Sequence, residues 1–158
     1  MSLDSRELRN ALGRFATGVC VVTTVTGDDK AVGMTANSFS SVSLDPPLVL
    51  WSLQNNSEVF DHFAKPRYYA INILSNAQQE HSNLYAKKGE HLLDPDHFEP
   101  GRHGAPIIRE ALVSFECELE ATYEGGDHVI ILGKVHDMLA AADGEPLLFY
   151  GGGYRELR

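Results

Sequence analysis

Residues 114–139, SFECELEATYEGGDHVIILGKVHDML, contain two strand-like segments joined by a short glycine-rich turn. Apolar and polar residues alternate along the first segment, which is the pattern of a half-buried strand. The apolar face carries Phe115, Cys117, Leu119 and Ala121, and the polar face carries Ser114, Glu116, Glu118 and Glu120. Gly125 and Gly126 permit a tight turn between the segments. The stretch therefore predicts a long antiparallel hairpin.

Further β-rich segments occur along the rest of the chain. Strand-like runs cover 19–26, 31–39, 48–53, 67–74 and 147–154, and helical patterns cover 4–18, 57–64 and 77–86. The strands follow one another through turns and do not alternate regularly with helices, as a parallel α/β fold requires. The chain is therefore predicted to be mainly β (α+β), an antiparallel barrel with a few peripheral helices, because closure removes exposed sheet edges.

The N-terminal segment, DSRELRNALGRFATG, is predicted to be a helix. Its apolar residues recur at helical spacing, at Leu8, Leu12 and Phe15. Asp4 and Glu7 fit a capping box, and Gly18 supplies a stop signal. We expect the apolar face of this helix to pack on the core.

Size and composition favour a single domain spanning 1–158, since 158 residues suit one core. The net charge of −9, with Lys87-Lys88 as the densest basic piece, argues against nucleic-acid binding. No apolar run reaches the roughly 18–20 residues of a membrane helix, and MSLDSRELRN lacks the pattern of a signal peptide. Cys20 and Cys117 are interpreted as buried thiols of a cytoplasmic protein, although a bridge between them stays open.

The stretch GMTANSFSSVSLDPPLVLWSL, residues 33–53, is unusually rich in hydroxyl and amide groups for a segment between strands. Such groups, with backbone N–H groups freed where pairing ends, can bind a ligand edge that has both donors and acceptors. Met34, Phe39 and Trp51 can supply an apolar wall beside them. The stretch predicts a cofactor pocket; the alternative is a serine-rich turn that bonds only to its own backbone.

Two further motifs point to ligand binding. In WSLQNNSEVF, Ser57 is predicted to cap a helix whose free N–H groups form an anion site, or simply to be an ordinary cap. In EGGDHVIILG, Asp127 can orient His128 toward an amide or a phosphate, although a hairpin turn explains the glycines alone.

Three histidines, His91, His97 and His103, recur at intervals of six residues in an irregular segment, 87–111. Six residues fits neither one helix face nor a close chelate, so we assign no metal ligand and expect ordinary loop histidines. No side chain is assigned as catalytic.

Together these motifs resemble the short-chain flavin reductases, the reductase components of two-component flavin monooxygenases. The resemblance spans nearly the whole chain, through ALGRFATGVCVVTT, GMTANSFSSVSLDPPLVLWSL, INIL, GDHVIILGKV and PLLFYGGGY. It implies a split β-barrel, a homodimer, and FMN or FAD at the barrel rim near the subunit interface. The implied reaction is hydride transfer from nicotinamide C4 of NADH or NADPH to flavin N5. Reduced flavin then serves a partner monooxygenase, in the breakdown of aromatic compounds.

The resemblance also implies which residues bind the two nucleotides. Those implied for the flavin are Met34, Thr35, Ala36, Asn37, Ser38, Ser52, Leu53, Gln54, Ser57, Ser82 and Lys87, with Lys88 as an alternative to Lys87. Those implied for the nicotinamide nucleotide are His128 and Tyr150.

Two other functions compete with this one. A non-enzymatic flavin-binding or carrier protein needs no nicotinamide site, so the retained Gly126-Asp127-His128 turn and Tyr150 argue against it. A pyridoxine-phosphate oxidase would need a set of basic residues around a phosphate, which the sequence does not show.

Overall fold

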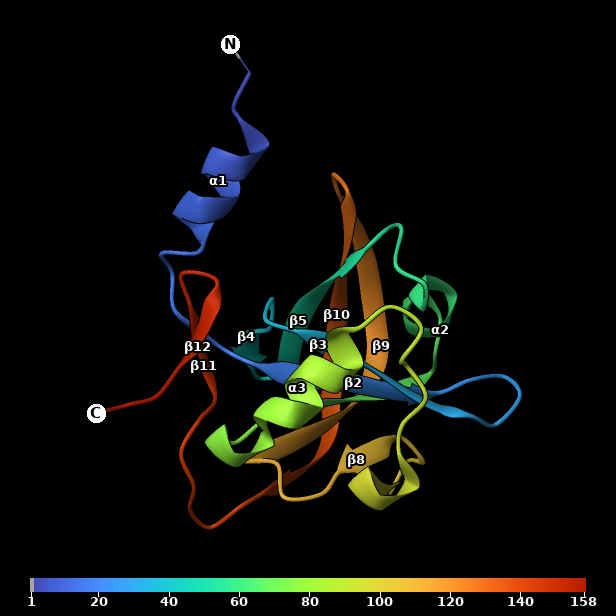
Figure 1. The fold of residues 1–158 in the computed structure, drawn as a ribbon. Helices are drawn as coiled ribbons and strands as arrows, with labels where there is room; N and C mark the ends of the chain where they lie inside the picture. Colours follow the sequence, from blue (N-terminus) through green and yellow to red (C-terminus); the bar gives the residue numbers. More distant parts are fainter. Residues whose placement is uncertain (1) are drawn as a thin grey trace.

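The computed structural model describes residues 2–158, and its main feature is one seven-stranded antiparallel sheet that curls into an open barrel (Figure 1). The order across the sheet is β3-β2-β6-β9-β10-β5-β4. The strands are β2 (Cys20–Val25), β3 (Ala31–Ala36), β4 (Ser40–Leu44), β5 (Pro47–Gln54), β6 (Tyr68–Ile73), β9 (Val113–Gly125) and β10 (His128–Ala140). The predicted antiparallel barrel with few helices is confirmed.

The barrel is open between β3 and β4, which are the two ends of the strand order although they are neighbours in sequence. Only residues 37–39 connect them, so the two free edges lie close together at this end. The alternative interpretation of the serine-rich stretch as a turn does not hold for residues 40–44, which form the exposed edge strand β4 paired with β5. The polar stretch therefore lines the opening of the barrel.

The β9–β10 hairpin is confirmed, with pairing from Val113↔Ala140 to Gly125↔His128. Gly126 has φ +71°, a conformation that favours glycine at this tight turn. The polar face of the first strand is, however, partly buried: Glu116 is 2% exposed. The turn at 101–105 covers it, and Glu116 Oε2 accepts hydrogen bonds from the backbone N–H groups of His103 and Ala105.

Hydrophobic side chains form two clusters, one inside the barrel and one outside. The inner cluster includes Cys20, Val22, Trp51, Leu53, Ile71, Cys117 and Ile131. The outer cluster lies under α3 (Gln79–Ala86) and includes Val19, Val21, Leu74, Tyr85, Leu93 and Ile108. β2 contributes to both clusters, so it is buried on both faces from Cys20 to Thr24 and its pattern does not alternate. The buried hydroxyls of Thr23 and Thr24 donate to backbone carbonyls. Both cysteines are free and buried, as predicted.

The remaining helical and irregular segments cover the barrel. A 3₁₀ turn at Asn76–Gln78 precedes α3, and α2 (Phe60–Ala64) packs Phe63 edge-on against Trp51. The long excursion after α3 contains a 3₁₀ turn at Pro95–His97 and two short paired strands, β7 (Phe98–Pro100) and β8 (Pro106–Ile108). Within residues 2–158, no helix has the length and apolar content that a membrane crossing requires.

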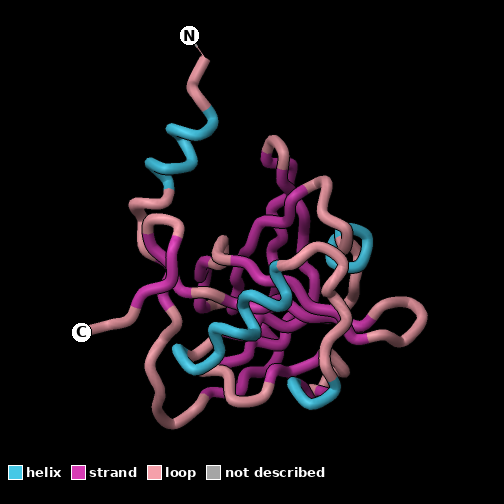
Figure 2. The backbone as a smooth tube through the Cα atoms, viewed as in Figure 1, coloured by secondary structure: helices cyan, strands magenta, loops and turns pink. Residues whose placement is uncertain are grey.

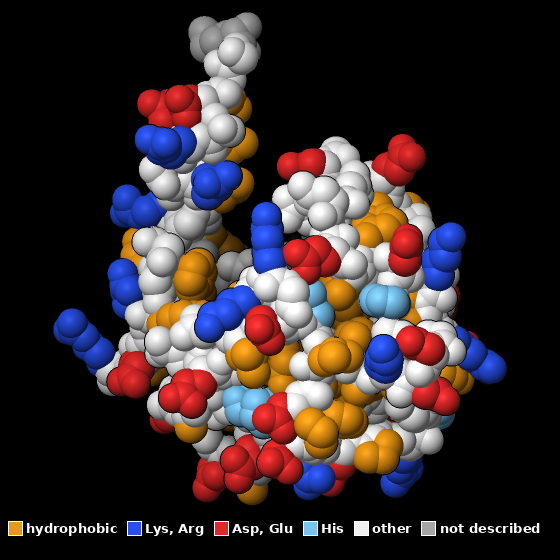
Figure 3. Space-filling model, turned by 45° about the vertical axis from the view of Figure 1, so that its right-hand side comes forward, with side chains coloured by type: hydrophobic (Ala, Val, Ile, Leu, Met, Phe, Trp, Pro, Cys, Tyr) orange, Lys and Arg blue, Asp and Glu red, His pale blue; other side chains and the backbone are white. Residues whose placement is uncertain are grey.

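The N-terminal helix α1 (Ser5–Leu12) projects away from the barrel (Figures 1 and 2). Asp4 caps it as predicted, but it ends at Gly13, before Gly18. The prediction that it packs on the core is wrong, since α1 has no buried residue and Phe15 just after it is 80% exposed. Figure 3 shows hydrophobic side chains along one side of this projecting helix. Its apolar face therefore has no partner within the described chain.

A small second sheet ties the two chain ends together beside the barrel (Figure 1). It consists of β1 (Thr17–Gly18), β11 (Leu148–Tyr150) and β12 (Gly153–Arg155) in the order β1-β11-β12. The predicted single strand over 147–154 is wrong, because the chain reverses at Gly151-Gly152, where both residues have positive φ. We call residues 2–15 together with this sheet the terminal arm.

Candidate cofactor site

Two adjoining cavities lie along β3, where it faces α3. The first, the Gln54 cavity, has a volume of about 440 Å³ and is lined by Met34, Thr35, Gln54, Asn56, Ser57, Glu58, Tyr85, Ala86, Lys88 and His91. The second, the Ser82 cavity, has a volume of about 240 Å³ and is lined by Val19, Thr35, Ala36, Asn37, Ser82, Ala86, Phe149 and Tyr154. Both share Thr35 and Ala86. Together they offer one elongated binding region.

These cavities bring together seven of the residues that the resemblance implied for a flavin. Met34, Thr35, Gln54 and Ser57 line the Gln54 cavity, and Thr35, Ala36, Asn37 and Ser82 line the Ser82 cavity. Lys88 lines the Gln54 cavity, whereas Lys87 lines neither and is the residue that ends α3. The basic group at this position of the site is therefore that of Lys88.

A chain of hydroxyl groups connects β3, α3 and the terminal arm in the Ser82 cavity. Thr35 Oγ1 donates to the backbone carbonyl of Ser82 at 2.7 Å. Ser82 Oγ lies 2.6 Å from the hydroxyl of Tyr154, which donates to Asn83 Oδ1 at 3.0 Å. Because the tyrosine proton goes to Asn83, Ser82 is the donor to Tyr154. Sequence reasoning missed Tyr154; its only signal was an aromatic residue after three glycines.

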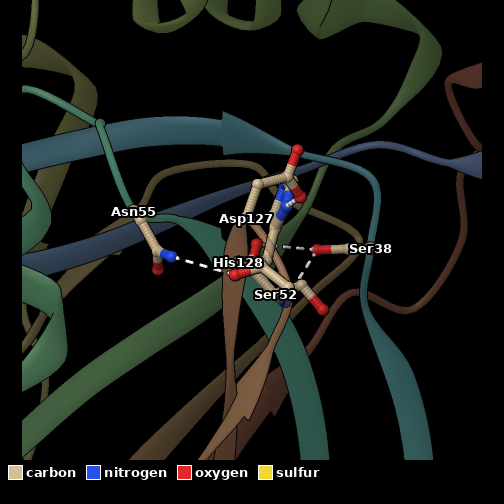
Figure 4. A network of polar contacts seen from close by, with 6 residues as sticks. Ser38, Ser52, Asn55, Asp127 and His128 are labelled. Atoms are coloured by element: carbon tan, nitrogen blue, oxygen red, sulfur yellow. Dashed lines mark hydrogen bonds and ion pairs between the residues drawn. The ribbon is translucent and has the colours of Figure 1, made fainter. Parts of the chain in front are cut away.

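Ser38 and Ser52 contact each other at the opening of the barrel (Figure 4). The backbone N–H of Ser52 donates to Ser38 Oγ at 2.9 Å, and Ser38 Oγ is 3.2 Å from the carbonyl oxygen of Ser52. The Ser38 hydroxyl is thus occupied by β5. The side chain of Leu53 is fully buried in the inner cluster, so Leu53 can present only its backbone to a ligand.

Ser57 lies in the site but not as a helix cap, so that prediction is wrong. The helix α2 begins at Phe60, and its N-cap is Val59, without a side-chain cap. Ser57 Oγ instead accepts a weak hydrogen bond from the backbone N–H of Val59 at 3.3 Å. The five-residue α2 starts too late for the Ser57 side chain to cap it, and the N–H of Phe60 donates to the Ser57 backbone carbonyl at 3.1 Å. Any contribution of Ser57 comes from its position on the wall of the Gln54 cavity.

The Gly-Asp-His turn lies beside the end of β5, because His128 is directly opposite Gln54 in the β10–β5 pairing. Asn55 holds this turn through its backbone N–H, which donates to the Asp127 carbonyl at 2.9 Å, and through its side chain, which donates to the Gly126 carbonyl at 3.2 Å (Figure 4). The turn and the polar residues after β5 thus form one rigid group.

Asp127 orients the ring of His128. The carboxylate Oδ1 of Asp127 lies 2.7 Å from His128 Nδ1. This hydrogen bond, together with the attraction to the ring, holds the pKa of Asp127 below its ordinary value. Because a carboxylate only accepts, Nδ1 carries the hydrogen, and Nε2 is the ring nitrogen left for a ligand.

Tyr150 is in a different place from His128. It is on β11 in the terminal arm, and its hydroxyl accepts a hydrogen bond from Arg14 Nε at 3.0 Å. Neither cavity is lined by Tyr150 or by His128. Within one chain, the structure does not bring the two implied nicotinamide residues into one cavity.

The three regularly spaced histidines diverge. His91 contacts Glu58, His97 contacts Tyr85, and His103 stacks on Tyr68. Within residues 2–158 no group of three or more metal-ligating side chains is arranged to hold an ion. A larger cavity, of about 530 Å³, is lined by His81, His97, Arg109 and other residues, but by none of the residues predicted to bind a cofactor.

Comparison with known proteins identifies similar sequences over nearly the entire length. The flavin reductase like domain matches residues 12–158. An FMN reductase (NADH) of Agrobacterium fabrum is 46% identical over 153 residues, covering 96% of this chain and 85% of that protein. The reductase subunit of a flavin-dependent monooxygenase of Mycobacterium tuberculosis is 35% identical over 159 residues, covering 96% and 82%.

A solved structure agrees with these similarities. The NADH:FAD oxidoreductase of Streptomyces globisporus, in complex with NAD and FAD fragments, superposes with a TM-score of 0.92 and 35% identity. The alignment covers 100% of this chain and 98% of that one.

Proposed function

The chain belongs to the flavin reductase-like family, and from this we propose that it is an NADH-dependent flavin reductase that supplies reduced flavin to a separate monooxygenase. The observation that carries the proposal is the pair of adjoining cavities, in which seven residues expected to contact a flavin line one continuous region. The proposal covers residues 1–158 as a single domain.

The donor set of the two cavities fits a flavin. Asn37 and Gln54 offer amide groups that can donate and accept, as the polar edge of the flavin ring requires. Thr35 and Ser57 offer hydroxyls suited to a polyol, and Lys88 offers a positive charge for a phosphate. FMN and FAD share these features, and we propose that either can bind.

A bound flavin supplies a ring that accepts a hydride from the reduced nicotinamide, so the chain need only bind and orient the two nucleotides. His128 is proposed to hold the nicotinamide amide through Nε2, since Asp127 already occupies Nδ1. The neighbouring strand end at Gln54 places this imidazole next to the cavity that would hold the flavin.

We propose that the protein is a homodimer in which the terminal arm packs on a second copy. The exposed apolar side of the arm supports this, since Leu12 is 67% and Phe15 is 80% exposed. A second copy would also explain why Tyr150 lies apart from His128, because the arm of one chain can complete the cavity of the other. A cytoplasmic location is proposed from the two free thiols.

The test of the proposed function is flavin-dependent oxidation of NADH, followed at 340 nm with FMN and FAD in turn. We expect absorbance loss only when flavin is present, and faster loss with NADH than with NADPH. A non-enzymatic carrier would bind flavin, seen as quenched flavin fluorescence, without oxidising NADH. That result would exclude the reductase while leaving the flavin site in place.

A further inference from the structure

Residues 87–93, the segment directly after α3, form the outer wall of the Gln54 cavity through Lys88 and His91. They pair with the free edge of β3: the N–H of Gly33 donates to the His91 carbonyl at 2.8 Å, and the N–H of Leu93 donates to the Ala31 carbonyl at 3.0 Å. A Cβ atom at Gly33 would lie 2.8 Å from Leu93 Cδ2. The glycine thus allows the wall to pack directly on the strand.

One carboxylate holds the outer part of this wall. Glu58, which lies just before α2, accepts a hydrogen bond at Oε2 from the backbone N–H of Gly89 at 2.7 Å. The same oxygen lies 3.4 Å from His91 Nε2. Glu58 therefore contacts two residues, Gly89 and His91, that closely follow Lys88, and Lys88 itself lines the cavity. A charged acceptor makes such hydrogen bonds stronger than neutral ones.

The ring of His91 is placed between two acceptors. Its Nδ1 lies 3.2 Å from the carbonyl oxygen of Gly33, which can only accept, so Nδ1 carries a hydrogen. A neutral ring would then turn the lone pair of Nε2 toward the Glu58 carboxylate. Only the protonated ring donates to both the Gly33 carbonyl and the Glu58 carboxylate. The His91 side chain is largely buried, at 16% exposed. The contact between Glu58 and His91 is thus an ion pair in the protonated state.

We propose that Glu58 and His91 are positioning residues: they fix the wall at 87–93 and thereby hold Lys88 in the cavity that binds flavin. The ligand part of this inference rests on the proposed function, whereas the anchoring of the wall does not. The other titratable groups that line the Gln54 cavity are Lys88 and Tyr85. Burial raises the pKa of Tyr85, so its hydroxyl stays neutral.

The anchoring is tested without flavin, by hydrogen exchange of residues 87–93 in the full chain. Glu58→Ala should speed exchange of the Gly89 amide about tenfold, because its acceptor is lost. Glu58→Gln should speed it less, since an amide oxygen still accepts. Glu90→Gln is the matched control, because it removes the same charge from an exposed side chain of the same segment. Unchanged exchange in both Glu58 variants would overturn the proposal.

Flavin affinity is then measured by quenching of flavin fluorescence, with FMN and with riboflavin. Glu58→Ala and His91→Gln should each weaken FMN binding about tenfold relative to Glu90→Gln. Riboflavin has no phosphate for Lys88 to contact, so its binding should be weakened less than that of FMN in both variants.

The two proposals fail in different ways. If the wild type neither binds flavin nor oxidises NADH, the proposed function fails, and the exchange data alone decide whether Glu58 anchors the wall. If the wild type binds flavin but the variants keep wild-type affinity for FMN, the positioning role is wrong and the reductase stands. Thermal unfolding of each variant establishes that it is folded before either comparison.

Discussion

The hydroxyl of Ser38 takes the place of a strand partner for Ser52. It accepts a hydrogen bond from the backbone N–H of Ser52 and donates one to its carbonyl oxygen. The β4–β5 ladder pairs Ser40 with Leu50 and does not continue beyond it. A serine side chain therefore satisfies two backbone groups at the point where the barrel opens and β3 leads into β4.

Replacing Ser38 by Ala should lower the free energy of unfolding by about 1–2 kcal/mol, because two part-buried backbone groups lose their partner. Urea unfolding measures this. Ser40→Ala is the control, since that exposed hydroxyl donates only to the adjacent Ser41 carbonyl. Equal losses in both variants would contradict the role assigned to Ser38.

Tyr154→Phe should weaken FMN binding about fivefold, because the Ser82 hydroxyl loses the acceptor that orients it in the Ser82 cavity. Fluorescence titration of FMN measures the change. Tyr123→Phe, which removes a hydroxyl from an exposed site on the hairpin, should bind FMN like the wild type. Wild-type affinity in Tyr154→Phe would show that the hydroxyl chain does not orient Ser82 for the ligand.

His128→Ala should raise the KM for NADH about tenfold and leave the FMN dissociation constant unchanged, since one ligand contact is lost. Steady-state rates and FMN titration separate the two effects. His136→Ala is the control, because His136 forms a similar pair with Glu118 farther along β10. A changed FMN affinity with an unchanged KM would reverse the assignment of His128.

The orientation of His128 should persist to acidic pH. Hydrogen bonding to His128 lowers the pKa of Asp127, so the carboxylate stays ionised below the ordinary range of an aspartate. The stabilisation from the hydrogen bond between Asp127 and His128 is fully present above the ordinary pKa of an aspartate. It is lost only as the pH falls through the lowered pKa of Asp127. Asp127→Ala, which removes the acceptor, should therefore raise the KM for NADH across the neutral range, whereas Asp127→Asn, whose amide oxygen still accepts, should raise it less. An unchanged KM in Asp127→Ala would exclude this orienting role.

Alkaline pH should destabilise the protein through its two thiols. Burial raises the pKa of Cys20 and of Cys117 from 9.0 to about 12. A raised folded-state pKa gives stability that is complete below pH 9 and is lost as the pH rises toward 12, because the unfolded chain ionises first. At pH 10 each thiol should account for about 1.4 kcal/mol of lost stability.

Urea unfolding at pH 7 and pH 10 measures this loss. The Cys20→Ala/Cys117→Ala variant should lose less stability between the two pH values than the wild type, whatever its stability at pH 7. If the variant loses as much stability as the wild type, the two thiols are not the cause of the destabilisation at pH 10.

Charge on the apolar side of the terminal arm should dissociate the proposed homodimer. Leu12→Glu and Phe15→Glu should sediment as single 17.4 kDa chains at concentrations where the wild type sediments as a pair. Val25→Glu, a change at an exposed position on β2, should leave the pair intact. A monomeric wild type would refute the dimer.

The local elements of this protein could be predicted from the sequence because their signals are local. Alternation in 114–123, the glycines at 125 and 126, and the cap at Asp4 all act over a few residues. The β-branched run at 19–26 marked a strand, and the structure shows that β2 within it is buried on both faces. A cofactor pocket in 33–53 could be proposed because a run of hydroxyls and amides is unusual between strands, whereas the individual residues expected to contact a flavin came from the resemblance to flavin reductases.

Contacts between distant segments were decided only by the tertiary structure. Alternation in β9 could not show that the turn at 101–105 buries Glu116, nor could the lysine pair show which of Lys87 and Lys88 reaches the cavity. Tyr154 and Glu58 belong to the candidate site through hydrogen bonds that span 72 and 31 residues. By itself the sequence determined most of the strands, but not β4 or the reversal within 147–154, and it determined which residue types a cofactor would need. Tertiary structure decided which of them meet, because side-chain pattern sets local conformation whereas packing and strand pairing set distance.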